Sequence, residues 1–89
     1  MADTKEELAG QIREIVCEQM GVKPGQVTNE ASFLTDLGAD ELDFVELIME
    51  MEEQFGTAIT NEEAEAANTF GKLVDLVYAH VNGRNGDGE

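Results

Sequence analysis

Gly38 to Phe55 reads Gly-Ala-Asp-Glu-Leu-Asp-Phe-Val-Glu-Leu-Ile-Met-Glu-Met-Glu-Glu-Gln-Phe, an acidic segment with a broad apolar stripe. Its apolar residues recur at helical spacing, and acidic residues fill most of the other positions, which predicts an amphipathic helix. Asp40 is suited to cap this helix, with Asp43 completing the capping pattern, because aspartate accepts hydrogen bonds from unpaired first-turn amides. Glu41 in the first turn favours the helix dipole by roughly 0.3–1 kcal/mol. We therefore expect a helix from Asp40 to about Phe55.

The apolar residues of this helix are more numerous than one buried stripe requires. One face consists of Phe44, Leu47, Met51 and Phe55, and Ile48 borders it. A second face consists of Leu42, Val45 and Met49. If only the first face is core, the second is an exposed strip flanked by carboxylates, as a docking surface for a basic, apolar-grooved partner needs. Periodicity alone equally allows a central helix that is buried on two sides.

Two further segments carry clear helix signals. Thr4 is a cap for a first helix that extends to about Met20, and Gly21 is suited to end it because glycine adopts the left-handed conformation without strain. Thr60 opens a short helix through about Ala67 with another capping pattern. No strand alternation and no internal repeat is present, so the fold class is all-α.

The last helix is expected to begin after Thr69 as its cap and to end at Asn82-Gly83. The polar, glycine-rich residues 84–89 are expected to form a disordered tail. Residues 22–38 form a long loop whose candidate anchors are Val22, Val27, Phe33, Leu34 and Leu37. Together these segments predict one domain over residues 1–83, a four-helix bundle with three longer helices and one short helix.

Composition excludes several kinds of partner. The chain has 89 residues and a formal net charge of −15, which repels nucleic acid and attracts basic protein surfaces. Its single cysteine, Cys17, cannot form an internal disulfide, and we expect it at the border of the core rather than as a reactive thiol. No apolar run reaches the length of a membrane span or a signal sequence. We expect a cytoplasmic monomer.

Five short motifs follow one another along the chain. They are Glu18-Gln19-Met20-Gly21-Val22-Lys23, Val27-Thr28-Asn29-Glu30-Ala31-Ser32-Phe33, Asp36-Leu37-Gly38-Ala39-Asp40, Val45-Glu46-Leu47 and Glu62-Glu63-Ala64-Glu65. In combination they resemble the acyl carrier proteins of bacterial fatty-acid synthesis. The resemblance implies a right-turning bundle that holds an acyl chain between its helices and presents it, on a flexible thioester arm, to successive enzymes.

The resemblance also implies a partner-binding surface on the second helix, which is the surface that the family's enzymes read. The acidic positions that would meet Lys and Arg of a partner are Asp40, Asp43, Glu46, Glu52 and Glu53. The apolar contact positions are Leu42, Val45 and Met49. The implied partners are acyl-chain-processing enzymes and a phosphopantetheinyl transferase.

Asp40-Glu41-Leu42 resembles the family's Asp-Ser-Leu segment, whose serine carries the 4'-phosphopantetheine arm. A transferase joins that arm to a hydroxyl oxygen, which the Glu41 side chain lacks. The nearest hydroxyls, Thr35 and Thr57, and the only serine, Ser32, are misplaced. We therefore expect no phosphopantetheine on this chain, and we expect it on a Glu41→Ser variant.

Several explanations of Glu41 stay open. The protein is a carrier-like paralogue that docks without cargo, a non-loadable mutant of a working carrier, or a protein with an unrelated regulatory role. Phe44 is larger than the family's pattern suggests and is a candidate to fill part of the acyl-chain space. The acyl pathway, whether of fatty acids, lipid A or polyketides, also stays open.

Two other classes of function fit the sequence poorly. No His, Lys or Arg lies near the clustered carboxylates to give them distinct protonation states, and His80 reads as a boundary residue, so no catalytic residue is expected. The segment before Glu41 superficially resembles a calcium loop, but Leu37 and Ala39 stand where oxygen ligands are needed, so no metal site is expected. The stronger alternative is a cargo-free interaction or regulatory protein that uses the same acidic helix to bind a basic partner.

Overall fold

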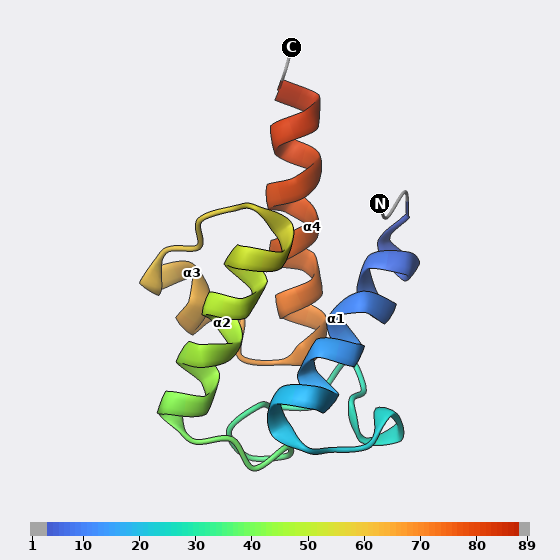
Figure 1. Ribbon diagram of the computed structural model, residues 1–89, viewed down its shortest axis with the longest axis vertical. Helices are drawn as coiled ribbons and strands as arrows, with labels where there is room; N and C mark the ends of the chain where they lie inside the picture. Colours follow the sequence, from blue (N-terminus) through green and yellow to red (C-terminus); the bar gives the residue numbers. More distant parts are fainter. Residues whose placement is uncertain (1–3, 88–89) are drawn as a thin grey trace.

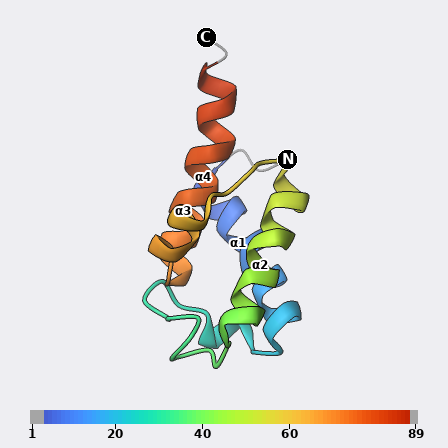
Figure 2. The ribbon, with the colours of Figure 1, turned by 90° about the vertical axis from the view of Figure 1, so that its left-hand side faces the viewer.

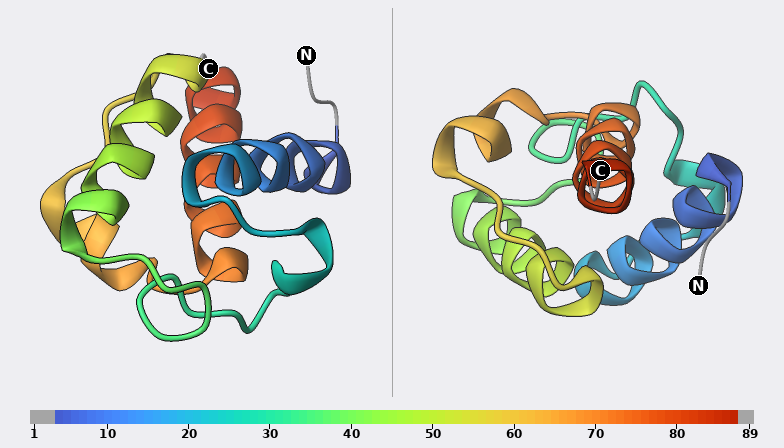
Figure 3. Two further views of the ribbon diagram at one scale, coloured as in Figure 1. Left: turned by 60° about the horizontal axis from the view of Figure 1, so that its bottom comes forward. Right: turned by 90° about the horizontal axis from the view of Figure 1, so that it is seen from above.

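The computed structural model describes residues 4–87, with side chains described through Asn82. Its elements are α1 (Lys5–Met20), the 3₁₀ turn η1 (Pro24–Gln26), α2 (Glu41–Phe55), α3 (Asn61–Ala66) and α4 (Phe70–Asp87). Figure 1 shows α1, α2 and the short α3 arranged around α4, and the view from above in Figure 3 looks nearly along α4. The predicted all-α bundle of three longer helices and one short helix is confirmed for this part of the chain.

Local hydrogen bonds and backbone conformations set the starts of α1, α3 and α4 and the ends of α1 and α2 where the sequence predicts them. The side chains of Thr4, Thr60 and Thr69 each accept a hydrogen bond from a first-turn amide, at 3.1, 3.1 and 3.3 Å. α1 and α2 end at Gly21 and Gly56, whose φ angles of 67° and 61° lie in the left-handed region that glycine tolerates. These ends are therefore encoded by residues that are close together in sequence.

The core lies where α1, α2 and α4 face one another. Its most deeply buried helical residues are Leu8, Ile12, Val16, Leu47, Ile48, Met51, Phe70, Leu73, Val74 and Val77. The first apolar face of α2, with Ile48 at its border, supplies Leu47, Ile48 and Met51. Phe44 and Phe55 of the same face are half-buried and pack against this core. This face is the core face of α2, as the periodicity predicts.

The loop between α1 and α2 is fastened to the beginning of α4 by backbone hydrogen bonds. The Phe33 amide donates to the Asn68 carbonyl at 3.2 Å, and the Phe70 amide donates to the Ala31 carbonyl at 3.0 Å. The Arg13 guanidinium stacks on the Phe70 ring at 4.8 Å and donates to a loop carbonyl. The loop passes beneath the bundle in Figure 2 and closes the lower end of the core. Its buried apolar anchors include Val27, Phe33 and Leu37, as expected, while Val22 is half-buried.

The prediction that Leu34 anchors the loop is wrong. Its side chain is 46% exposed, although it was expected to anchor the loop. Phe33, directly before it, fills the core position, and the turn that follows leaves its neighbour on the outside. Leu34 is therefore exposed to solvent.

The end of α4 is also corrected. The helix continues to Asp87, beyond the expected stop at Asn82-Gly83, so residues 84–87 are helical rather than part of an irregular tail. Glycine costs a helix only about 1 kcal/mol relative to alanine, which does not by itself impose an end. The remaining residues of the expected tail, 88–89, lie outside the described residues.

Candidate docking surface and cleft on α2

The second apolar face of α2 is exposed. Leu42, Val45 and Met49 are 65%, 50% and 59% accessible to solvent. The alternative of a helix that is buried on two sides is therefore wrong. A contiguous exposed apolar strip of this kind is a candidate contact site.

A cleft of about 630 Å³ lies beside this strip, between α2 and α3. Its apolar lining consists of Phe33, Leu34, Phe44, Val45, Ile48, Met49, Ile59 and Ala64. Its polar lining consists of Glu41, Glu52, Asn61, Glu65 and Asn68. The rings of Phe33 and Phe44 pack at 5.4 Å between centroids, so Phe44 forms part of the wall and a cleft remains beside it.

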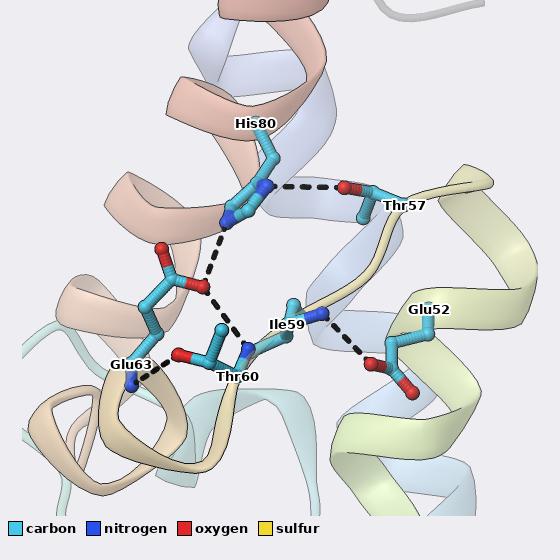
Figure 4. Close-up of polar contacts among 6 residues, drawn as sticks. All are labelled: Glu52, Thr57, Ile59, Thr60, Glu63 and His80. Atoms are coloured by element: carbon cyan, nitrogen blue, oxygen red, sulfur yellow. Dashed lines mark hydrogen bonds and ion pairs between the residues drawn. The ribbon is translucent and has the colours of Figure 1, made fainter.

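Three of the predicted partner-binding carboxylates already have partners within the molecule. The Asp40 carboxylate accepts a hydrogen bond from the Asp43 amide at 2.8 Å, and the Asp43 carboxylate accepts one from the Asp40 amide at 3.3 Å. The Glu52 carboxylate accepts a hydrogen bond from the Ile59 amide at 2.7 Å (Figure 4). These groups contribute to the negative field of the surface, but they also hold α2 and the segment after it in place.

The other acidic side chains of the surface are free. Among the described residues, none donates a hydrogen bond to Glu41, Glu46 or Glu53 or forms an ion pair with them, and all three are exposed. A basic partner can therefore pair with these carboxylates without breaking a contact inside the domain. Glu41 differs from the other two because it lines the cleft.

A polar cluster links α3 and α4 to the segment that follows α2. His80 Nε2 lies 3.1 Å from the Glu63 carboxylate, and its Nδ1 lies 3.1 Å from the Thr57 hydroxyl (Figure 4). The Thr60 amide that donates to the Glu63 carboxylate lowers the pKa of Glu63 below its ordinary value, and His80 acts in the same direction. The capping pattern predicts the Thr60 contact, but no sequence signal predicts that His80 reaches it.

Possible metal ligands, the surroundings of Cys17 and the apolar character of the helices can be stated for the described residues. No group of His, Cys, Asp and Glu within residues 4–87 is arranged to hold a metal ion. Arg13, which lies one turn from Cys17, is engaged by Phe70 and a loop carbonyl and so serves the fold rather than a thiolate. No helix in this part of the chain has the length and apolar character needed to cross a membrane.

Comparison with known proteins identifies the family. Residues 10–77 match the family described as a phosphopantetheine attachment site. An acyl carrier protein from Enterococcus faecalis is similar in structure, with a TM-score of 0.75 and 32% sequence identity over 86% of this chain and 98% of that one. Proteins of this kind are carriers in acyl metabolism rather than enzymes, and they interact with acyl-processing enzymes. With its helical bundle and its matching sequence, the chain belongs to the acyl carrier protein family.

Proposed function

We propose that this chain is a carrier-type module that docks on carrier-dependent enzymes through α2 and does not itself carry phosphopantetheine. One observation carries the proposal: α2 presents an exposed apolar strip and unpaired carboxylates together. Burial of Leu42, Val45 and Met49 supplies contact energy, since each buried aliphatic side chain contributes roughly 1.5–3 kcal/mol. The carboxylates steer a basic partner toward this strip.

The unpaired carboxylates Glu46 and Glu53 are the primary charge contacts in this proposal. Asp40, Asp43 and Glu52 add to the field, but their loss would also disturb the cap of α2 or the segment after it. This division refines the expectation from the sequence, in which the acidic positions of the surface are equivalent. It also separates binding effects from folding effects in experiments.

The residues present do not fit covalent attachment of the arm. Residue 41, which the resemblance places at the attachment point, has a carboxylate and no hydroxyl. The Ser32 hydroxyl accepts a hydrogen bond from the Thr35 amide at 3.3 Å, and the Thr57 hydroxyl contacts His80. Neither hydroxyl lies in the first turn of α2. The chain therefore acts without a covalent arm, as a paralogue or non-loadable form, or as a cargo-free regulator that uses the same surface.

Charge reversal tests the docking surface. We expect Glu46→Lys combined with Glu53→Lys to weaken binding to a bacterial malonyl-coenzyme A transacylase, which acts on carriers, by about ten-fold or more, because it places like charges face to face. Isothermal titration calorimetry measures the affinity, and circular dichroism checks that helical content is unchanged. Glu14→Lys combined with Glu18→Lys, which reverses two exposed carboxylates on α1, is the matched control. If the double reversal and the control bind equally well, the docking surface is not on α2.

Intact mass tests the missing attachment. After incubation with a broad-specificity phosphopantetheinyl transferase and coenzyme A, we expect no added mass on the native chain and one phosphopantetheine on Glu41→Ser. A gain in mass on the native chain would overturn the unloaded state. The serine variant shows whether the scaffold is otherwise competent.

A further inference from the structure

Glu41 combines features that no other carboxylate of the surface shares. It is exposed in the first turn of α2, it lines the α2–α3 cleft, and no described residue pairs with it. Leu34 and Val45, both about half-exposed, line the same cleft. Two other carboxylates, Glu52 and Glu65, line the cleft as well, but Glu52 is bonded to the Ile59 amide and Glu65 lies on α3. Glu41 is therefore the unpaired carboxylate that α2 brings to the edge of this apolar hollow.

The carboxylate of Glu41 resembles in charge the phosphodiester that joins the family's phosphopantetheine arm to its serine. A serine joined to phosphopantetheine carries a phosphodiester, which has one negative charge at neutral pH. The phosphorus of a phosphoserine linkage and the carboxyl carbon of glutamate are the same number of bonds from Cα. Both groups present anionic oxygens, and Arg and Lys recognise carboxylate and phosphate oxygens through the same donors. Glutamate at this position thus keeps the charge of a loaded carrier while removing the cargo.

We propose that the mouth of the cleft binds the cationic group with which a protein recognises the phosphodiester of a loaded carrier. This inference rests on the proposed docking through α2, and it adds the class of partner. The partner places Arg or Lys against Glu41 and an apolar side chain against Leu34 and Val45. By occupying the enzyme's docking site, the chain competes with loaded carriers.

The same charge disfavours a second class of partner. A phosphopantetheinyl transferase that holds coenzyme A brings phosphate groups to the attachment position. Since Glu41 is exposed and negative, it repels those phosphates. The substitution therefore directs the chain toward enzymes that use loaded carriers and away from the enzyme that loads them.

Competition with a loaded carrier tests the proposal. The probe is a bacterial malonyl-coenzyme A transacylase acting on the phosphopantetheine-loaded carrier of Enterococcus faecalis, with the native chain as inhibitor. We expect Glu41→Gln, which keeps the shape and loses the charge, to raise the inhibition constant roughly ten-fold, as expected for loss of one charge-assisted hydrogen bond. Glu41→Asp, which withdraws the carboxylate by one methylene, should also inhibit less well. Glu46→Gln, which removes the charge of an exposed carboxylate on α2 outside the cleft, measures how far inhibition depends on docking through the rest of the surface.

The outcomes separate this inference from the docking function. If Glu41→Gln inhibits as well as the native chain while Glu46→Gln inhibits less, docking through α2 stands and the role of Glu41 is overturned. If neither the native chain nor any variant inhibits, docking fails and the inference fails with it. With the transferase and coenzyme A as probe, the order must reverse, so that Glu41→Gln inhibits better than the native chain. If the native chain is the better inhibitor of both enzymes, the charge acts only as general attraction, which also overturns the proposal.

Discussion

Removing the Glu52 carboxylate should destabilise the domain, although the residue is one of many acids on α2. Its side chain accepts the Ile59 amide at 2.7 Å, and Ile59 is buried against the core. This bond holds the segment after α2 against the helix beside the cleft. Glu52 is therefore expected to behave as part of the fold.

The magnitude follows from the geometry. A hydrogen bond to a charged group contributes about 1.5–3 kcal/mol, and partial exposure of the pair favours the lower end of this range. For Glu52→Ala we therefore expect a loss of about 1.5 kcal/mol, which lowers the melting temperature of a domain of this size by roughly 6–12 °C. Glu52→Gln keeps an acceptor without the charge and should lose about half as much.

Glu53→Ala is the matched control, because Glu53 is the adjacent residue and has no partner among the described residues. It removes the same charge from a chain with a net charge of −15, so its melting temperature should stay level or rise slightly. Thermal unfolding followed by circular dichroism measures all three variants. Equal melting temperatures for Glu52→Ala and Glu53→Ala would refute the structural role of Glu52.

Three further predictions concern stability. Gly71→Ala should destabilise by about 1–3 kcal/mol in urea titration, because its Cβ would lie 3.0 Å from the Asn29 carbonyl oxygen. Gly10→Ala, which meets nothing within 4 Å, should instead stabilise by up to about 1 kcal/mol, and equal effects would contradict the packing at Gly71. The pKa of Glu63 is lowered from 4.5 by the Thr60 amide, so its contribution is present above that pH and is lost as the pH falls through the lowered value. Glu63→Gln should thus weaken the acid-induced fall in melting temperature, and an unchanged profile would count against it. Added sodium chloride should raise the melting temperature by screening self-repulsion, and a flat or falling response would show that repulsion is not limiting.

The sequence predicts those parts of the fold that depend on neighbours in the chain. Asp40 and Gly56 mark the ends of α2 because a cap and a left-handed stop each need only a local backbone conformation. The exposed strip is one of two outcomes that helical spacing allows, because spacing alone does not show which faces are covered. The sequence offers Leu34 as a candidate loop anchor, and the structure exposes it, because an apolar loop residue carries no signal for the side it faces.

The roles of the acidic residues depend on distant parts of the chain. Glu52 and Glu53 are adjacent and chemically identical, but only Glu52 meets the Ile59 amide where the chain returns along α2. His80 reaches Glu63 only because α3 packs beside α4. Periodicity therefore identifies an acidic surface, but three-dimensional contacts are needed to separate the carboxylates that are bonded within the domain from those that are unpaired.

The difference between paired and unpaired carboxylates on α2 affects what this surface recognises. Carboxylates that hold the domain together are constrained by folding, whereas the unpaired ones are constrained by partners, by net charge and, in the first turn of a helix, by the helix dipole. Glu41 belongs to the second group, and fold stability alone does not require a carboxylate there, because the cap of α2 is made by Asp40 and Asp43. A neutral side chain at position 41 would lessen the self-repulsion of a chain with a net charge of −15. The favourable interaction of Glu41 with the helix dipole, roughly 0.3–1 kcal/mol, is opposed by this repulsion, and we therefore propose that a positively charged partner accounts for the acidic residue at the mouth of the cleft.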